Sequence, residues 1–142
     1  LMDLRLQIEL SVSLHAASDA LRSRLMPINK QYPLKTLMKE LKEYILRTNR
    51  QVTFEYIMID KLNSSDADAL MLARLIKGMN CKVNLIPFNT TSAARDFKPP
   101  LASEIKLFEK TLTAEGVKNT LRDSRGADIQ GACGQLSLST RV

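Results

Sequence analysis

Cysteine and histidine are scarce in this 142-residue sequence, which has two of the former and one of the latter. The cysteines, Cys81 and Cys133, lie far apart, which is neither a metal-ligand spacing nor a disulfide framework. No hydrophobic run approaches the roughly 18 residues of a membrane span, and the first residues lack the basic-then-apolar order of a secretory signal. These absences favour a protein of the reducing cytoplasm, with no membrane partner.

Glycine-rich phosphate-binding loops are also missing. No G-x-G-x-x-G or Walker-type sequence is present, which counts against a nucleotide-binding Rossmann domain or a kinase. The net charge of +6 suits a phosphate-rich partner such as RNA, but it is also ordinary for a domain of this size. Lys35, Lys39 and Lys42 recur at helical spacing, and a solvated helix face explains them better than an RNA-binding stripe.

Strand and helix periodicities alternate along the chain. A period of two predicts a strand over residues 8–15, and after a polar turn the spacing of Leu34 to Ile45 predicts a helix. A second helix is expected after a cap at Ser65 with Asp68, and a third after a cap at Ser103, ending at Gly116. Further strands are predicted over residues 51–60, 82–88 and 117–122.

This order predicts an α/β fold with a parallel sheet and right-handed crossovers. A doubly wound sheet and part of a barrel both fit the pattern. Ser11, Ser13 and His15 help to choose between them, because polar side chains are costly to bury against helices without partners. They fit better on the concave face of a barrel, near the carboxyl ends of its strands, where ligands bind.

Cys133 lies between small residues, Gly131-Ala132 before it and Gly134 after it. Glycines leave no side chain to shield the sulfur, so a substrate could approach this nucleophile closely. The flanking residues alone nevertheless favour a small residue in a glycine-rich tail. Cys81 has no glycine neighbour and is predicted to be a buried small hydrophobic residue.

Four blocks of this sequence resemble, in the same order, the radical-SAM RNA adenine methyltransferases of the RlmN/Cfr family. They are SLHA…LR…LMPIN at 13–29, VTFEY at 52–56, CKVNLIPFN at 81–89 and RGADIQGACGQL at 125–136. The resemblance implies the C-terminal half of a (βα)6 partial TIM barrel over residues 1–122, covering about strands 4 to 6 plus a final short strand. It also implies a C-terminal tail over residues 123–142 that carries the cysteine.

The resemblance implies S-adenosyl-L-methionine as a cofactor, contacted by Ser13, Leu14, His15 and Asn89. Without it, a lone histidine is more often structural than a ligand, and Asn89 is equally well explained as a turn residue at a strand end. The family also holds a 4Fe-4S cluster on a C-x-x-x-C-x-x-C loop, and this chain contains no such loop. We therefore expect the isolated chain to be an inactive part of a longer enzyme.

The resemblance further implies that Cys133 is the catalytic residue, methylated on sulfur before radical chemistry transfers the carbon to adenine. The expected reaction is methylation of an adenosine of 23S rRNA at C2, with tRNA as a further candidate substrate. Two alternatives stay open: the C8-methylating antibiotic-resistance branch of the family, and a non-catalytic RNA-binding remnant. The isolated fragment is also expected to self-associate through an open sheet edge at its first strand.

Overall fold

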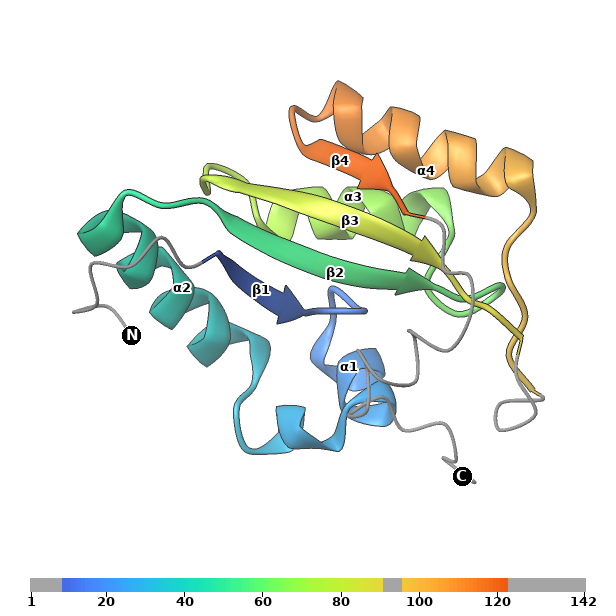
Figure 1. The fold of residues 1–142 in the computed structure, drawn as a ribbon. Helices are drawn as coiled ribbons and strands as arrows, with labels where there is room; N and C mark the ends of the chain where they lie inside the picture. Colours follow the sequence, from blue (N-terminus) through green and yellow to red (C-terminus); the bar gives the residue numbers. More distant parts are fainter. Residues whose placement is uncertain (1–8, 91–95, 123–142) are drawn as a thin grey trace.

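Four parallel strands form the centre of the structure, a computed structural model that describes residues 9–90 and 96–122 (Figure 1). The strands follow one another in space as they do in sequence: β1 (Leu10–Ser13), β2 (Val52–Met58), β3 (Cys81–Pro87) and β4 (Lys118–Leu121). A doubly wound sheet would reverse its strand order at one point. The sequential order within the described residues is that of a barrel segment, which resolves the choice left open by the periodicity.

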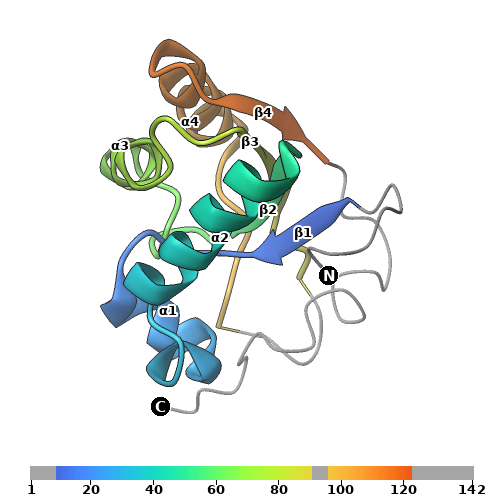
Figure 2. The same cartoon turned by 90° about the vertical axis from the view of Figure 1, so that its left-hand side faces the viewer.

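Three helices cover one face of the sheet (Figures 1 and 2): α2 (Leu34–Thr48), α3 (Asp66–Leu75) and α4 (Ala102–Ala114). Alternate residues of β2, beginning at Val52, point into this layer and are fully buried. Tyr56 of β2 packs against Phe108 of α4, with ring centroids 5.4 Å apart. Burying one such aromatic side chain contributes about 1.5–3 kcal/mol, so this layer is the main hydrophobic core.

A second, smaller core closes the opposite face at the carboxyl ends of the strands. Here Leu25 of α1 (Asp19–Leu25) packs with Ile57 of β2 and Ile86 of β3. Phe88 and Phe97 extend this cluster, with their rings 5.6 Å apart and edge to face. Towards the amino ends of the strands the same face carries polar side chains, so among the described residues the apolar cover of this face is confined to its carboxyl end.

The structure confirms the predicted alternation of parallel strands and helices. The cap at Ser65 is also confirmed, because its Oγ accepts from the Asp68 N–H at 3.1 Å while an Asp68 carboxylate oxygen accepts from the Ser65 N–H at 3.0 Å. Gly116 follows the end of α4 with φ +83°, as a C-terminal glycine should. The predicted tail over residues 123–142 lies outside the described residues.

Two predictions of local structure were wrong. The expected polar turn before Pro33 contains α1 and a short 3-10 helix, η1 (Pro27–Lys30). Helix α1 has only seven residues, too few for its periodicity to stand out. Ser103 does not cap α4, because the helix begins at Ala102, one residue before Ser103. The Glu104 carboxylate instead accepts from the Leu101 N–H at 3.1 Å, at the start of the helix. None of the helices within the described ranges is long and apolar enough to cross a membrane.

Candidate functional site

A polar row crosses the sheet on the face that α2, α3 and α4 leave uncovered. The register places Ser13, Glu55, Asn84 and Thr120 side by side on the four strands. Thr120 donates from its hydroxyl to the Asn84 side-chain oxygen at 2.7 Å. The guanidinium of Arg122 contacts both carboxylate oxygens of Glu55, at 2.9 and 3.2 Å. This row is what a barrel interior requires, because polar groups there find partners on neighbouring strands.

Directly after Ser13 the chain makes a tight turn at the carboxyl edge of β1. The Ala16 N–H donates to the Leu14 carbonyl at 2.8 Å, and His15 at the centre of this three-residue turn has φ 59°. A positive φ is uncommon for a residue other than glycine and is concentrated at functional sites. Leu14 is fully buried, with its side chain in the main core. Its N–H donates to the Glu55 carbonyl at 2.9 Å and its carbonyl accepts from the Ala16 N–H, so both of its backbone groups have partners within the protein.

His15 is buried rather than open to the concave face, with 1% of its surface exposed. Its Nδ1 accepts a hydrogen bond from the Ile57 N–H at 3.0 Å. Burial, reinforced by the positive charge of Arg22, lowers the pKa of His15 to about 3. The ring is therefore neutral at physiological pH, and because Nδ1 is an acceptor, Nε2 carries the proton. Among the described residues this Nε2–H donor has no hydrogen-bond partner.

The turn is held by side chains from two other segments. The Arg22 guanidinium, in α1, donates to the carbonyl oxygens of Ser13 and Leu14, at 2.9 and 3.1 Å. The Asn63 side-chain amide, in the connection between β2 and α3, donates to the His15 carbonyl at 2.8 Å. Both side chains are buried. The site is thus assembled from β1, α1 and the end of β2.

Asn89 lies two residues beyond the end of β3 and is partly buried. The preceding residue, Phe88, continues the sheet by donating its N–H to the Met58 carbonyl at 2.9 Å. Asn89 therefore lies at the same carboxyl edge of the sheet as His15, with β2 between their strands. This is the edge at which parallel α/β folds bind ligands.

Of the two cysteines, Cys81 lies within the described residues and Cys133 does not. Cys81 begins β3 at the opposite, amino edge of the sheet, and burial raises the pKa of its thiol to about 11. Its predicted role as a small buried hydrophobic residue is confirmed, since 8% of it is exposed and it packs in the main core. Cys133, predicted as the catalytic residue, lies outside the described residues.

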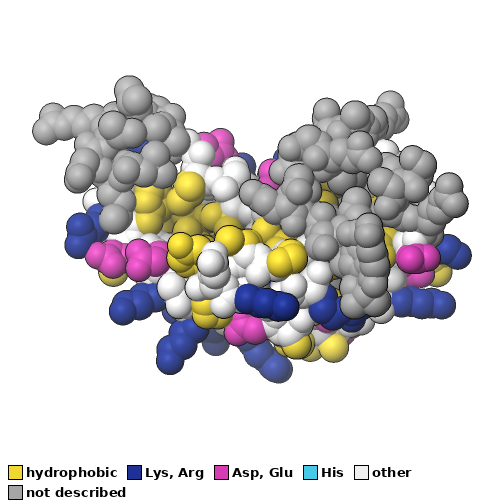
Figure 3. Space-filling view, turned by 90° about the horizontal axis from the view of Figure 1, so that it is seen from below, with side chains coloured by type: hydrophobic (Ala, Val, Ile, Leu, Met, Phe, Trp, Pro, Cys, Tyr) yellow, Lys and Arg dark blue, Asp and Glu magenta, His cyan; other side chains and the backbone are white. Residues whose placement is uncertain are grey.

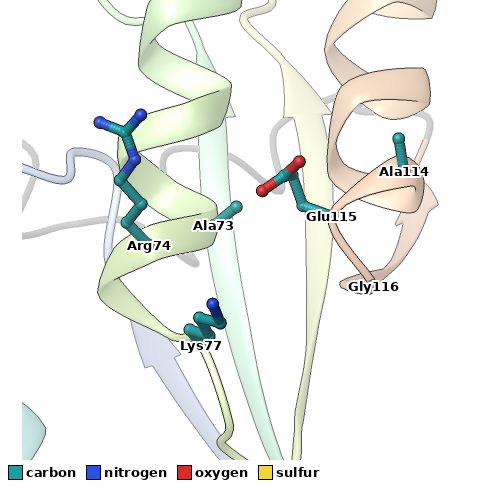
Figure 4. A pocket seen from close by; sticks show the side chains of 6 residues that line it. All are labelled: Ala73, Arg74, Lys77, Ala114, Glu115 and Gly116. Atoms are coloured by element: carbon teal, nitrogen blue, oxygen red, sulfur yellow. The ribbon is translucent and has the colours of Figure 1, made fainter.

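A surface hollow of about 440 Å³ separates the ends of α3 and α4 (Figure 4). Figure 4 shows the Glu115 carboxylate pointing from the end of α4 towards α3, which contributes Arg74, followed by Lys77. The carboxyl ends of these helices lead into the amino ends of β3 and β4. The hollow therefore lies at the edge of the sheet opposite His15, and it is not part of the candidate site.

Charge on the surface is mixed. Seen from below (Figure 3), the Lys and Arg side chains of the described residues are interspersed with Asp, Glu and apolar ones and form no continuous basic surface among them. Lys35, Lys39 and Lys42 are exposed on α2. On the same helix Arg47 pairs with Glu43 at 2.8 Å. Both a solvated helix face and an RNA-binding stripe require this exposure, so the preference for a solvated face stays a prediction.

Comparison with known proteins assigns the family. No family model matches the chain. The chain is 48% identical, over 93% of its length, to the dual-specificity RNA methyltransferase RlmN of Paramagnetospirillum magneticum, and 45% identical, over 93%, to that of Syntrophotalea carbinolica. Over 95% of its length it matches the crystal structure of a radical SAM methyltransferase from Sphaerobacter thermophilus, with 49% identity and a TM-score of 0.86. The chain belongs to the RlmN family of radical-SAM RNA methyltransferases.

The chain spans 29% of the Paramagnetospirillum RlmN protein, 35% of the Syntrophotalea one and 39% of the Sphaerobacter structure. Sequence reasoning selected the turn at His15 but missed the side chains that hold it. Arg22 lies inside a matched block, and that position was the available signal, but no role was assigned to it. Nothing in the sequence pointed to Asn63, because its contact with the His15 carbonyl joins segments 48 positions apart.

Proposed function

We propose that this chain supplies part of the S-adenosylmethionine site and the methyl-carrying cysteine of an enzyme that methylates RNA adenosine at C2. The observation that carries the proposal is the neutral, buried Nε2–H of His15, which lacks a partner among the described residues at the ligand-binding edge of the sheet. The proposal is supported by the names of the relatives, which are RNA methyltransferases.

The chemistry of the turn fits this cofactor. A buried donor without a partner costs about 1–3 kcal/mol, which a bound acceptor would recover. S-Adenosylmethionine offers carboxylate, ribose and adenine acceptors, and when bound it supplies the methyl group and the source of the radical. Ser13 can offer its hydroxyl and His15 its Nε2–H. The N–H and carbonyl of Leu14 are already hydrogen-bonded within the protein, so the proposed part of Leu14 in the site is to hold its two neighbours in place. Asn89, at the same edge, has an amide that both donates and accepts.

The remaining parts of the proposal concern the tail and the substrate. Residues 123–142 would bring the thiol of Cys133 to the mouth of a partial barrel formed over residues 1–122. Cys133 Sγ would accept a methyl group by displacement and present its carbon to the adenine ring, because C2 of adenine is not itself nucleophilic. The proposed substrate is 23S rRNA, with tRNA as the second.

The residues of this chain do not fit the 4Fe-4S cluster of the family. The cluster needs three cysteines in one loop, whereas the chain has two, far apart in sequence. Cys81 is buried, and the raised pKa of its thiol disfavours the thiolate that a metal requires.

A single substitution tests the proposed cofactor site in the full-length gene product. His15→Asn keeps an acceptor for the Ile57 N–H and tolerates a positive φ, but it removes the Nε2–H donor. We expect S-adenosylmethionine to bind about tenfold more weakly by isothermal titration, the loss of one hydrogen bond to a charged or strongly polar group.

Lys61→Asn is the matched control, because Lys61 also has a positive φ, 62°, but forms no hydrogen bond with the described residues of the turn. It should leave the affinity unchanged. Unaltered binding by His15→Asn would refute the assignment of the site. Mass spectrometry of digested RNA then tests the reaction: 2-methyladenosine supports the proposal, and 8-methyladenosine would place the protein in the other branch.

A further inference from the structure

Three consecutive carbonyl oxygens at the end of β1 each accept a hydrogen bond from a buried side chain. The Arg22 guanidinium covers two of them in a fork, with Nη2 on Ser13 at 2.9 Å and Nε on Leu14 at 3.1 Å. Asn63 covers the third, on His15, at 2.8 Å. Without these contacts, backbone oxygens at this edge of a parallel sheet would face solvent or a ligand. The three hydrogen bonds therefore fix the direction of the carbonyl groups before any ligand arrives.

Arg22 is an unusual residue to bury. It is 4% exposed, and none of the ion pairs within the described residues includes it. Its Nη1 donates to the Asn29 side-chain oxygen at 2.8 Å. Asn29 in turn donates to Asp19 Oδ1 at 3.0 Å. Burying a guanidinium without a direct carboxylate partner is costly, and here carbonyl dipoles compensate the charge.

The turn that Arg22 holds is strained. A left-handed backbone at a residue with a Cβ costs roughly 1–2 kcal/mol and persists only where the surroundings over-determine it. At His15 the determinants are the two side-chain clamps, Arg22 and Asn63, together with the Ile57 N–H on the imidazole. The Arg22 fork acts on the two residues immediately before His15, where a shift would rotate the imidazole out of place.

We propose that Arg22 is a positioning residue for the cofactor site: its fork fixes the turn at His15 and thereby aims the Ser13 hydroxyl and the His15 Nε2–H. The identity of the ligand rests on the proposed function, whereas the hold on the turn does not. Arg22 touches no reacting atom; it acts through the backbone of its neighbours. A lysine at this position would keep the charge but lose the planar fork.

The test compares Arg22→Lys with Arg24→Lys in the full-length gene product. Arg24 lies on the same helix and is exposed, so it is the matched control. Amide hydrogen exchange by NMR reports the turn through the Ala16 N–H, which closes it, and the sheet through the Phe88 N–H, which bonds Met58. Isothermal titration reports the affinity for S-adenosylmethionine.

In Arg22→Lys we expect Ala16 to exchange about tenfold faster and S-adenosylmethionine to bind about tenfold more weakly, while Phe88 keeps its protection. If Arg22 only stabilised the fold, the amides of Ala16 and Phe88 would both exchange faster in the variant. Arg24→Lys should change none of the three readings. Unchanged exchange at Ala16, or unchanged affinity despite faster exchange, would overturn the proposal.

The failure of this inference and that of the proposed function are distinguishable. A wild-type protein that does not bind S-adenosylmethionine refutes the proposed function, even if Ala16 exchange shows that Arg22 holds the turn. A wild-type protein that binds, with an Arg22→Lys variant that binds equally well, refutes the positioning role alone. If Arg22→Lys does not fold, Arg22→Gln, which keeps an amide NH2 donor without a buried charge, decides by the same three readings: Ala16 exchange, Phe88 exchange and affinity.

Discussion

The imidazole of His15 and the backbone of Ile57 are joined by a hydrogen bond of 3.0 Å, with Nδ1 as the acceptor. This bond links the turn after β1 to the carboxyl half of β2 and settles which ring nitrogen carries the proton. It also makes a neutral histidine part of the native structure. Protonating Nδ1 would place two donors against each other inside a buried site.

Stability should therefore fall in acid because of His15. The pKa of His15 is about 3 in the folded protein and 6.5 in the unfolded chain. The unfolded state takes up the proton first, so the stabilisation is complete above pH 6.5 and is lost as pH falls towards 3. Between pH 7 and pH 5 we expect the free energy of unfolding to drop by roughly 2 kcal/mol more in the wild type than in His15→Asn.

Urea unfolding at the two pH values measures this difference. Other groups titrate in the same range, but they are shared by both proteins and cancel in the comparison. Equal acid sensitivity of the wild type and His15→Asn would show that the ring is not buried and neutral as described.

A second prediction concerns the edge of β1 that faces away from β2. Among the described residues β1 pairs with β2 alone. The Leu14 N–H points towards β2, where it donates to the backbone carbonyl of Glu55 at 2.9 Å. Amide directions alternate along a strand, so the Ser11 N–H points outwards from the sheet. The 142-residue chain should associate through this edge, and Ser11→Pro should reduce the association because it removes an outward donor.

Light scattering at increasing concentration tests this association. Ser11→Ala is the control, since it changes the same side chain but keeps the amide. A wild-type chain that stays monomeric at high concentration, or a proline variant that associates as strongly as the alanine variant, would contradict the edge model.

Alanine substitutions at the two cysteines should have different effects, because Cys133 has a proposed chemical role and Cys81 a packing role. In the full-length enzyme Cys133→Ala should abolish both S-methylation and RNA methylation. Cys81→Ala should leave the chemistry intact and cost about 1 kcal/mol of stability, because Cys81 is a small residue of the main core at the opposite edge of the sheet. Peptide mass spectrometry locates the added methyl group. Its presence on Cys81, or full activity of Cys133→Ala, would reverse the assignment.

The regular elements were predictable because their signals are local. The apolar face of α2 and the cap of α3 at Ser65 are both written in residues three or four positions apart. Helix α1 was missed because it is short and its buried face includes Arg22, a charged residue. Ser103 was chosen as a cap by residue type, whereas the Glu104 side chain decided where α4 begins.

The site was only partly predictable, for a physical reason. Periodicity placed Ser13 and His15 near the ligand-binding edge, and the matched block gave them a role. The burial of His15 depends on α1 and on Ile57, which lies 42 positions away. Its backbone conformation depends on hydrogen bonds from Arg22 and Asn63. Such contacts between segments leave no pattern in a single sequence.

The most direct measurement of the central claim is the NMR spectrum of His15 in 15N-histidine-labelled full-length protein, assigned by loss of the signal in His15→Asn. Before ligand is added, the ring should show a neutral Nε2–H form that does not titrate near pH 6.5. With S-adenosylmethionine, the Nε2–H proton should shift downfield and exchange more slowly, as a donor that has gained an acceptor. Binding of S-adenosylmethionine that leaves the His15 signals unchanged would contradict the account.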